Sequence, residues 1–310
     1  MKIALLTVFF PKISEFINDY LDSVAQQDFK NFSLVIVTDE FKIDLSAIKE
    51  KIKIPCYVLN SSSRPINNRI KGLNFCKKQN FDLVICNDAD DILYKNTVLN
   101  IYKFFKKNVK ENLAYCSLFY KENKKIRKFF KNKKNIFLDD VINHNYLGYG
   151  ALVLKKKLIP FFTECEKNKP LIFDWFFLLK YLLFYKRVKL IKDAKIFYRQ
   201  HRKNNLGPKR AFNKVIVKKS IKYKENTYSN LINICIKNNF KNITVFKKKI
   251  AEQNKLYDII NDKLIGKKYL SLIKKKFSKK KKVFWFEEAL YSRNLINKIY
   301  EIKKTPYKKF

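Results

Sequence analysis

Three carboxylates, Asp88, Asp90 and Asp91, stand close together directly after a short apolar run, Leu83 to Cys86. The run is bounded by polar residues and is typical of a buried strand in a parallel sheet. The carboxylates are therefore expected just past the carboxyl end of a strand, where open α/β sheets bind ligands. Neighbouring carboxylates repel one another, and Mg²⁺ or Mn²⁺ would offset that repulsion through the oxygen ligands that both ions prefer. The alternative is an acidic turn that caps a following helix, because Asp is a favourable N-cap residue.

Two further groups of residues could do chemistry. Asp174 is an acid within the aromatic run Phe173 to Phe177, and the sequence Tyr-Arg-Gln-His at 198–201 follows a strand-like run at 188–197. Arg199 suits phosphate oxygens because its guanidinium is planar and always charged. The alternative for His201 is an ordinary surface histidine.

The elements that must position these residues alternate along the chain. Apolar runs predict strands at 3–9, 33–38, 56–59, 81–86, 113–119 and 188–197, and helical periodicity predicts helices at 14–24, 66–79 and 98–105. This alternation predicts a parallel α/β sheet. The chain has five glycines, and none forms a Gly-x-Gly-x-x-Gly turn or a Walker loop, so these nucleotide-binding motifs are excluded. Two of the five lie in the strand-like run 147–154, where glycine often allows a close approach by a ligand or another backbone segment.

With these motifs in order, residues 1–208 resemble the inverting glycosyltransferases of family 2, which have the GT-A fold. The family's Asp-x-Asp-Asp metal motif is matched in full at 88–91. The family opens with a strand, a Thr and a helix, and Thr7 occupies the matching position here. The family's second strand ends in an Asp that contacts the nucleotide base, and Asp39 occupies that position. Its Ala-Arg-Asn-x-Gly segment is matched in part, since Arg69 and Gly72 are present but the Asn is replaced by Ile70.

The second half of the resemblance concerns the acceptor side and the end of the domain. The pair Asp174-Trp175 looks like the family's catalytic acidic pair, and Tyr-Arg-Gln-His, followed by Asn and by Gly207, is similar to rhamnosyltransferase-like members. The resemblance implies a GT-A α/β domain at 1–208, with a basic, mainly helical region at 209–310.

The implied reaction moves a sugar from a nucleoside-diphosphate donor to a hydroxyl of a cell-surface glycan or lipid-linked acceptor, with inversion. Mn²⁺ or Mg²⁺ would be held by Asp90 and His201, and would neutralise the leaving diphosphate. Asp174 would be the general base for the acceptor hydroxyl, and its aromatic neighbours are expected to be core residues that desolvate it. The remaining predicted donor-binding residues are Thr7, Asp39, Arg69, Asp88 and Arg199, with His201 also in reach of the diphosphate.

Charge is distributed unevenly. The formal net charge of the 310 residues is +41. Residues 1–100 have 13 basic side chains (Lys and Arg) and 12 acidic ones (Asp and Glu), residues 101–208 have 26 and 8, and residues 209–310 have 29 and 7. The basic part admits nucleic acid, an anionic membrane or acidic substrates as partners, or a compositional drift toward Lys. A nucleic-acid-binding protein is one alternative function, although no binding motif is present. A metal-dependent phosphotransferase is another, although Thr7-Val8-Phe9 occupies the place of its acidic nucleophile.

The last hundred residues predict membrane contact. Lys279 to Lys282 precede Val283 to Phe286, and the apolar positions Ala289, Leu290, Ile296, Ile299 and Tyr300 follow. As a helix, this segment would place an apolar stripe beside a basic one, which is typical of a helix lying on a membrane surface. We therefore expect peripheral attachment to the inner face of the cytoplasmic membrane. The alternative is that the stripe packs on the catalytic domain.

The remaining composition points to a cytoplasmic protein. The six cysteines form no Cys-x-x-Cys pair and are expected to be reduced and buried. No signal peptide and no transmembrane run of ~18 apolar residues is expected.

Overall fold

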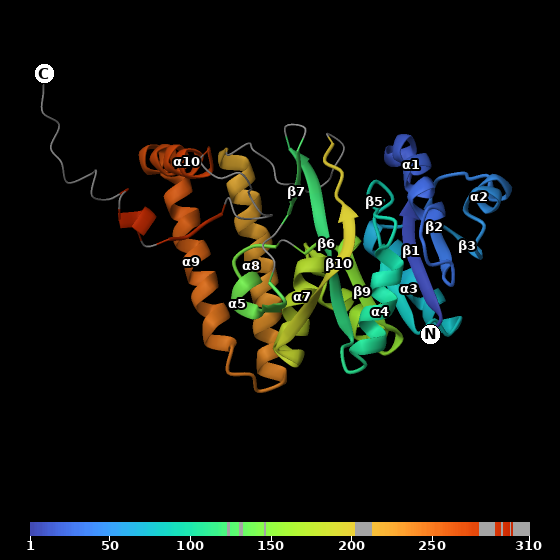
Figure 1. Cartoon of the computed structure of the whole chain (residues 1–310). Helices are drawn as coiled ribbons and strands as arrows, with labels where there is room; N and C mark the ends of the chain where they lie inside the picture. Colours follow the sequence, from blue (N-terminus) through green and yellow to red (C-terminus); the bar gives the residue numbers. More distant parts are fainter. Residues whose placement is uncertain are drawn as a thin grey trace, which may run out of the picture. The chain divides into compact units, whose positions relative to one another are not determined.

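The computed structural model describes residues 1–122, 125–129, 133–145, 147–201, 213–278, 289–292, 294–297 and 299. Its chain divides into two compact units (Figure 1). The first contains the described residues of 1–137, 147–168 and 185–201. The second contains those of 138–145, 169–184 and everything described from 213 onward. The second unit thus includes two segments that precede residue 209, and the predicted boundary at 208 stays a prediction.

The first unit is built on one sheet. Its strands are β1 (Ile3–Phe9), β2 (Ser33–Asp39), β3 (Cys56–Ser61), β4 (Leu83–Cys86), β5 (Ile92–Leu93), β6 (Leu113–Glu122), β7 (Lys125–Lys128), β8 (Asn135–Phe137), β9 (Leu152–Lys155) and β10 (Arg187–Phe197). The order is β3-β2-β1-β4-β9-β6-β10-β5, with β7 paired to β6 and β8 paired to β10. Strands β3, β2, β1 and β4 are mutually parallel, as are β6 and β10.

Burial on both faces explains the apolar runs of the central strands. All four residues of β4 and the first four of β1 are at most 1% exposed. Such strands need helices on both faces, which is typical of parallel sheets. The helices of this unit are α1 (Ser14–Ala25), α2 (Leu45–Ile52), α3 (Pro65–Lys78), α4 (Thr97–Lys107) and α6 (Ile159–Glu164). Helix α3 packs on β1 and β2, and α4 packs on β10.

The predicted α/β fold with a mostly parallel sheet is confirmed, and two elements depart from the sequence prediction. Strand β9 runs antiparallel to both of its neighbours, β4 and β6. The glycine-containing run 147–154 is not one strand, because a 3₁₀ turn, η2 (Tyr149–Ala151), precedes β9. The turn places its residues at the edge of the sheet where β4 ends.

The second unit is helical among its described residues. It contains α5 (Leu138–Val141), α7 (Phe173–Tyr185) up to residue 184, α8 (Lys214–Lys237), α9 (Ile243–Asn261) and α10 (Lys263–Ser278). Side chains of α8, α9 and α10 share one hydrophobic core, to which Val217, Leu256 and Tyr269 each contribute a side chain that is 0% exposed. Among the described residues, no helix has both the length and the apolar character that crossing a bilayer requires.

Candidate active site

The site is assembled by strand pairing between distant parts of the chain. After β4 ends at Cys86, the acidic segment 87–91 leads into β5, which pairs antiparallel with the end of β10. Ile92 is the register partner of Phe197, so the residues just before β5 lie beside those just after β10. Asp88, Asp90 and Asp91 therefore meet Arg199 and His201 at one edge of the sheet.

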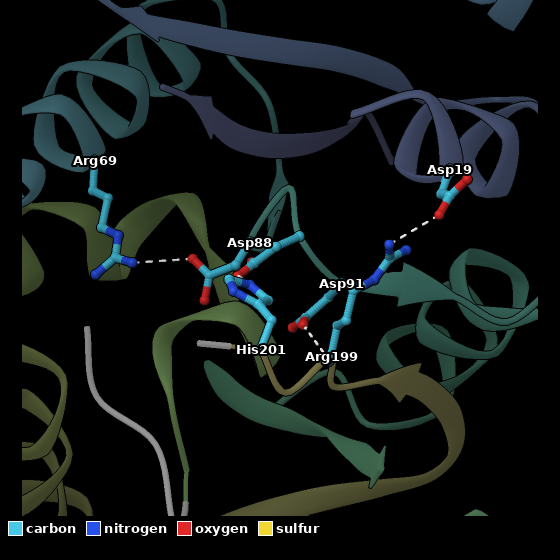
Figure 2. A network of polar contacts seen from close by, with 7 residues as sticks. Asp19, Arg69, Asp88, Asp91, Arg199 and His201 are labelled. Carbon is cyan, nitrogen blue, oxygen red and sulfur yellow. Dashed lines mark hydrogen bonds and ion pairs between the residues drawn. The ribbon is translucent and has the colours of Figure 1, made fainter. Parts of the chain in front are cut away.

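Asp88 is paired with Arg69 of α3. Nη2 of Arg69 donates to Oδ1 of Asp88 at 3.0 Å (Figure 2). The same guanidinium lies 4.1 Å from the ring centroid of Tyr149. Burial raises the pKa of the Asp88 carboxyl, Arg69 opposes the shift and Asp90 adds to it. A cation brought to these carboxylates would favour their ionised form.

Two residues of the sheet edge make room for Asp88 and hold its surroundings. A Cβ at Gly150 would lie 2.6 Å from Oδ2 of Asp88, so only glycine leaves space for this carboxylate. The buried Nδ2 of Asn87 donates to the carbonyl of Gly150 at 3.0 Å and ties the end of β4 to η2. The expectation that a glycine here allows a close approach is thus met by Gly150. Asn87 is a positioning residue that sequence analysis missed, because a single Asn carries no local pattern.

Asp90 and His201 form the pair that was predicted to hold a metal ion. Nε2 of His201 lies 2.9 Å from Oδ2 of Asp90, although 111 residues separate them. Their side chains are 13% and 15% exposed, so the pair is recessed but reachable. The His201 ring packs against Phe16 of α1, with the ring centroids 4.5 Å apart and the ring planes tilted by 32°. Among the described residues, no group of three or more His, Cys, Asp and Glu side chains is arranged to hold a metal ion.

Asp91 and Arg199 close the other side of the site. The backbone N–H of Arg199 donates to Oδ1 of Asp91 at 3.0 Å, and Nη1 of Arg199 donates to Oδ2 of Asp19 at 2.9 Å. Figure 2 shows the Arg69 side chain directed to Asp88, whereas Arg199 meets Asp91 through its backbone and directs its guanidinium to Asp19. Asp91 is 2% exposed, and burial, followed by repulsion from Asp90 and Asp88, raises its pKa well above the usual range.

Two predicted donor-binding residues do not join this cluster. Thr7 lies within β1 and its side chain is 0% exposed, so no atom of it reaches the surface. Asp39 ends β2 at the carboxyl edge of the parallel strands and is only partly buried. Their roles stay predictions.

The predicted general base, Asp174, belongs to the second unit. It lies in the first turn of α7, where Oδ1 accepts the backbone N–H of Trp175 at 2.9 Å and Oδ2 accepts Nδ2 of Asn145 at 3.3 Å. Trp175, Phe176 and Phe177 are each 0% exposed, so the prediction that these aromatics are core residues is confirmed.

A family comparison decides what kind of protein has this sheet edge. The profile of glycosyl transferase family 2 matches residues 6–176, which is more than half of the chain. The chain belongs to glycosyltransferase family 2. The predicted enzyme class is therefore confirmed over the nucleic-acid-binding and phosphotransferase alternatives. No curated protein matches this family 2 glycosyltransferase by sequence.

Solved structures support the GT-A fold at low sequence identity. TarS of S. aureus matches with a TM-score of 0.53 and 17% identity over 91% of this glycosyltransferase and 46% of the TarS chain. TarS 1–349 in complex with UDP matches with a TM-score of 0.53 and 16% identity, covering 90% of this chain and 73% of that one. The mannosyltransferase PcManGT of Pyrobaculum calidifontis, in complex with GDP-Man and Mn²⁺, matches with a TM-score of 0.54 and 12% identity. That match covers 99% of this chain and 88% of the PcManGT chain. This glycosyltransferase thus spans about half the length of full TarS.

Proposed function

We propose that this family 2 glycosyltransferase moves a sugar from a nucleoside-diphosphate donor to a hydroxyl of a glycan or lipid-linked acceptor, with inversion and with a divalent metal ion. The convergence of the acidic segment 87–91 with residues 199–201 on one sheet edge carries the proposal. TarS in complex with UDP-GlcNAc and PcManGT with GDP-Man and Mn²⁺ support it by analogy of fold.

The donor set at this edge fits Mn²⁺ or Mg²⁺. Asp90 and His201 offer a carboxylate oxygen and an imidazole nitrogen that are 2.9 Å apart. Burial, followed by repulsion from Asp90 and Asp88, raises the pKa of neighbouring Asp91, and a cation would offset that repulsion. Carboxylate suits both ions and imidazole suits Mn²⁺ better than Mg²⁺. Asp90 and His201 would hold the ion together with diphosphate and water oxygens, since no larger group of ligating side chains is arranged for a metal in the described part of the chain. When bound, the ion would neutralise the charge that develops on the leaving diphosphate.

The arginines would bind the donor, and Asp174 would accept the proton of the acceptor hydroxyl. Arg69 and Arg199 are each held at the site by a carboxylate, Asp88 and Asp19 respectively, so their guanidinium groups are oriented before a phosphate arrives. A guanidinium presents donors that match phosphate oxygens. Asp174 is held through both carboxylate oxygens, which fixes its direction for proton transfer in a single displacement.

A donor panel tests this proposal. The full chain is heated with nucleotide sugars of several bases and sugars, with Mn²⁺, with Mg²⁺ and with excess chelator. A donor at 100 times its dissociation constant should add about 2.7 kcal/mol to the free energy of unfolding. We expect one nucleotide class to stabilise the protein only with metal. Equal stabilisation in chelator would contradict the metal, and no stabilisation by any nucleotide sugar would contradict the donor class.

The stereochemistry is tested separately once a donor is identified. The anomeric configuration of the product, measured by NMR, should be opposite to that of the donor. Retention of configuration would exclude single displacement with Asp174 as base.

A further inference from the structure

The apolar stripe predicted for membrane contact is buried where the structure describes it. Ala289, Ile296 and Ile299 are 0%, 9% and 1% exposed and belong to the core shared with α8, α9 and α10. Lys279 to Phe286 and Tyr300 lie outside the described residues. A membrane contact in this unit, if it is made by described residues, must therefore use another surface.

Helix α10 provides a basic face. It has six lysines and no acidic residue in 16 positions. Its inner side chains, among them Tyr269 and Ile273 at 0% exposed, are in the core. The lysines Lys263, Lys267 and Lys274 are exposed on the outside of the helix. A charge pattern with the basic side outward and the apolar side inward leaves the lysines available to an anionic partner.

The start of α8, the end of α9 and the start of α10 meet at one end of the second unit. Val217, Leu256 and Ile265, one from each helix, belong to the same core. Nζ of Lys218 lies 5.3 Å from the ring centroid of Tyr257, which joins the outer faces of α8 and α9 at this end. Figure 1 shows the same ends of α8 and α9 gathered with α10.

Exposed apolar side chains are interspersed with the lysines at this end. Val215 of α8 is 73% exposed, Leu264 of α10 is 54% exposed and Tyr257 of α9 is 44% exposed. Of the acids nearby, Asp262 caps α10 by accepting the N–H groups of Leu264 and Ile265 at 2.9 and 2.7 Å. The basic-apolar surface is defined here by these three apolar side chains, by the lysines of the same helix ends, and by one lysine farther along the exposed side of α10: Lys214, Lys218, Lys219, Lys263, Lys267 and Lys274.

We propose that the basic-apolar surface docks this glycosyltransferase on an anionic membrane leaflet. Lysine ammonium groups attract the phosphates of anionic lipids, and apolar side chains enter the boundary between headgroups and acyl chains. A soluble polyanion would use the lysines but would gain nothing from exposed Val215 and Leu264. The combination of both kinds of side chain therefore favours a lipid surface over nucleic acid.

Vesicle flotation with the full chain tests the electrostatic part. The protein should float with phosphatidylglycerol-containing vesicles in low salt, and should stay behind with neutral vesicles or in high salt. In a triple variant, Lys263→Gln, Lys267→Gln and Lys274→Gln, the partition coefficient should fall about 10²-fold. The matched control, Lys237→Gln, Lys241→Gln and Lys247→Gln, removes the same charge from exposed positions at the end of α8 and around the start of α9. The control should change partitioning less than about threefold.

A second pair of variants tests the apolar part. Val215→Ser with Leu264→Ser should lower partitioning about tenfold, because both side chains would lose burial in the lipid boundary. Ile236→Ser with Val245→Ser, whose side chains are 59% and 37% exposed elsewhere in the unit, should leave it unchanged. Both variants should keep the melting temperature of the parent chain.

Three outcomes would overturn the proposal. The full chain could fail to float in low salt. The two lysine triples could lose equal affinity, so that net charge alone would matter. The serine variant at Val215 and Leu264 could float normally while the first lysine triple lost binding to single-stranded DNA as well, which would identify a soluble polyanion as the partner.

Discussion

At the scale of single residues, the site depends on the space left by one missing side chain. Gly150 lies under the Asp88 carboxylate, and the same Asp88 accepts Arg69. Asn87 donates to the carbonyl of Gly150 and so ties the end of β4, which leads into Asp88, to the turn η2. The position of the Asp88 carboxylate therefore depends on Gly150, Arg69 and Asn87 together.

Gly150→Ala should disturb the site more than the fold. Its Cβ would lie 2.6 Å from Oδ2 and 3.2 Å from the backbone nitrogen of Asp88, so the acidic segment must shift. We expect transferase activity to fall at least about tenfold and stability to fall by about 1–3 kcal/mol. Gly148→Ala is the control, because φ −78° and ψ 168° at Gly148 suit any residue. Full activity of Gly150→Ala, measured beside that control, would show that Asp88 need not stay in place.

Asp90→Asn tests the metal pair directly. The amide keeps the shape of the side chain next to His201 but removes the charge that a divalent ion needs. Because a bound metal contributes several kcal/mol to the transition state, transfer should fall by about 10³-fold. Thermal stabilisation by donor with Mn²⁺ should disappear as well. Asp28→Asn, which removes an exposed partner of Lys95, is the charge-matched control. Metal-dependent stabilisation that survives in Asp90→Asn would place the ion elsewhere.

At the scale of elements, the short segment 138–145 of the second unit is held by two buried side-chain hydrogen bonds. Nε1 of Trp175 in α7 donates to the backbone carbonyl of Val141 at 2.9 Å. The hydroxyl of Tyr228 in α8 donates to the backbone carbonyl of Ile142 at 2.6 Å. Asn145 follows in the same segment and donates to Asp174. Helices α7 and α8 thus fix a turn that orients the proposed base.

Tyr228→Phe should loosen that turn. The change leaves the buried carbonyl of Ile142 without this donor, which should lower the free energy of unfolding by about 1–3 kcal/mol. Tyr257→Phe, at a residue that is 44% exposed, should stay within about 0.5 kcal/mol. Denaturant unfolding of both variants provides the comparison, and equal stability would show that the Tyr228 bond contributes nothing net.

Asp174→Asn should separate chemistry from binding. An amide at this first-turn position of α7 keeps its hydrogen bond from Trp175 but cannot accept a proton from the acceptor. The turnover number should fall about 10²–10⁴-fold. Donor affinity, followed by thermal shift, should hardly change. A collapse of donor affinity would assign Asp174 to the donor site and remove its role as base.

At the scale of the whole molecule, chain order and structural units do not coincide. The second unit takes in 138–145 and 169–184 together with the helices after 213. Its core residue Trp175 has its ring 5.9 Å from that of Tyr228, so segments on both sides of residue 208 build it.

A chain that ends at residue 208 should therefore not behave as a folded protein. It would lose α8, α9 and α10, and the buried Trp175 would be left without the ring of Tyr228, which lies 5.9 Å from its own. We expect aggregation, dye binding to exposed apolar surface and no cooperative thermal transition. A chain that ends at residue 299 keeps all described residues and serves as control. A monomeric 1–208 protein that unfolds cooperatively and binds donor would support the predicted boundary instead.

Local pattern was sufficient for some of these features. The apolar run Leu83 to Cys86 followed by Asp88, Asp90 and Asp91 defined a strand and an acidic edge, because burial and side-chain type are properties of neighbouring residues. Alternating strands and helices then predicted the parallel α/β sheet, and the ordered motifs predicted the family. These inferences need no knowledge of which strands are adjacent.

Tertiary structure decided through which contacts the site residues meet, although the family resemblance had already assigned Asp90 and His201 to one metal ion. Strand β9 enters between β4 and β6 in the opposite direction, and β5 pairs with β10, so Gly150 reaches Asp88 and His201 reaches Asp90. Tertiary structure also decided which apolar side chains are buried. The apolar stripe that includes Ala289 and Ile296 could have faced a membrane or a protein core, and in the structure both side chains lie in the core. Long-range pairing depends on the free energy of the whole packed chain, in which each apolar face is buried against a partner far away in sequence, and no local window contains that partner.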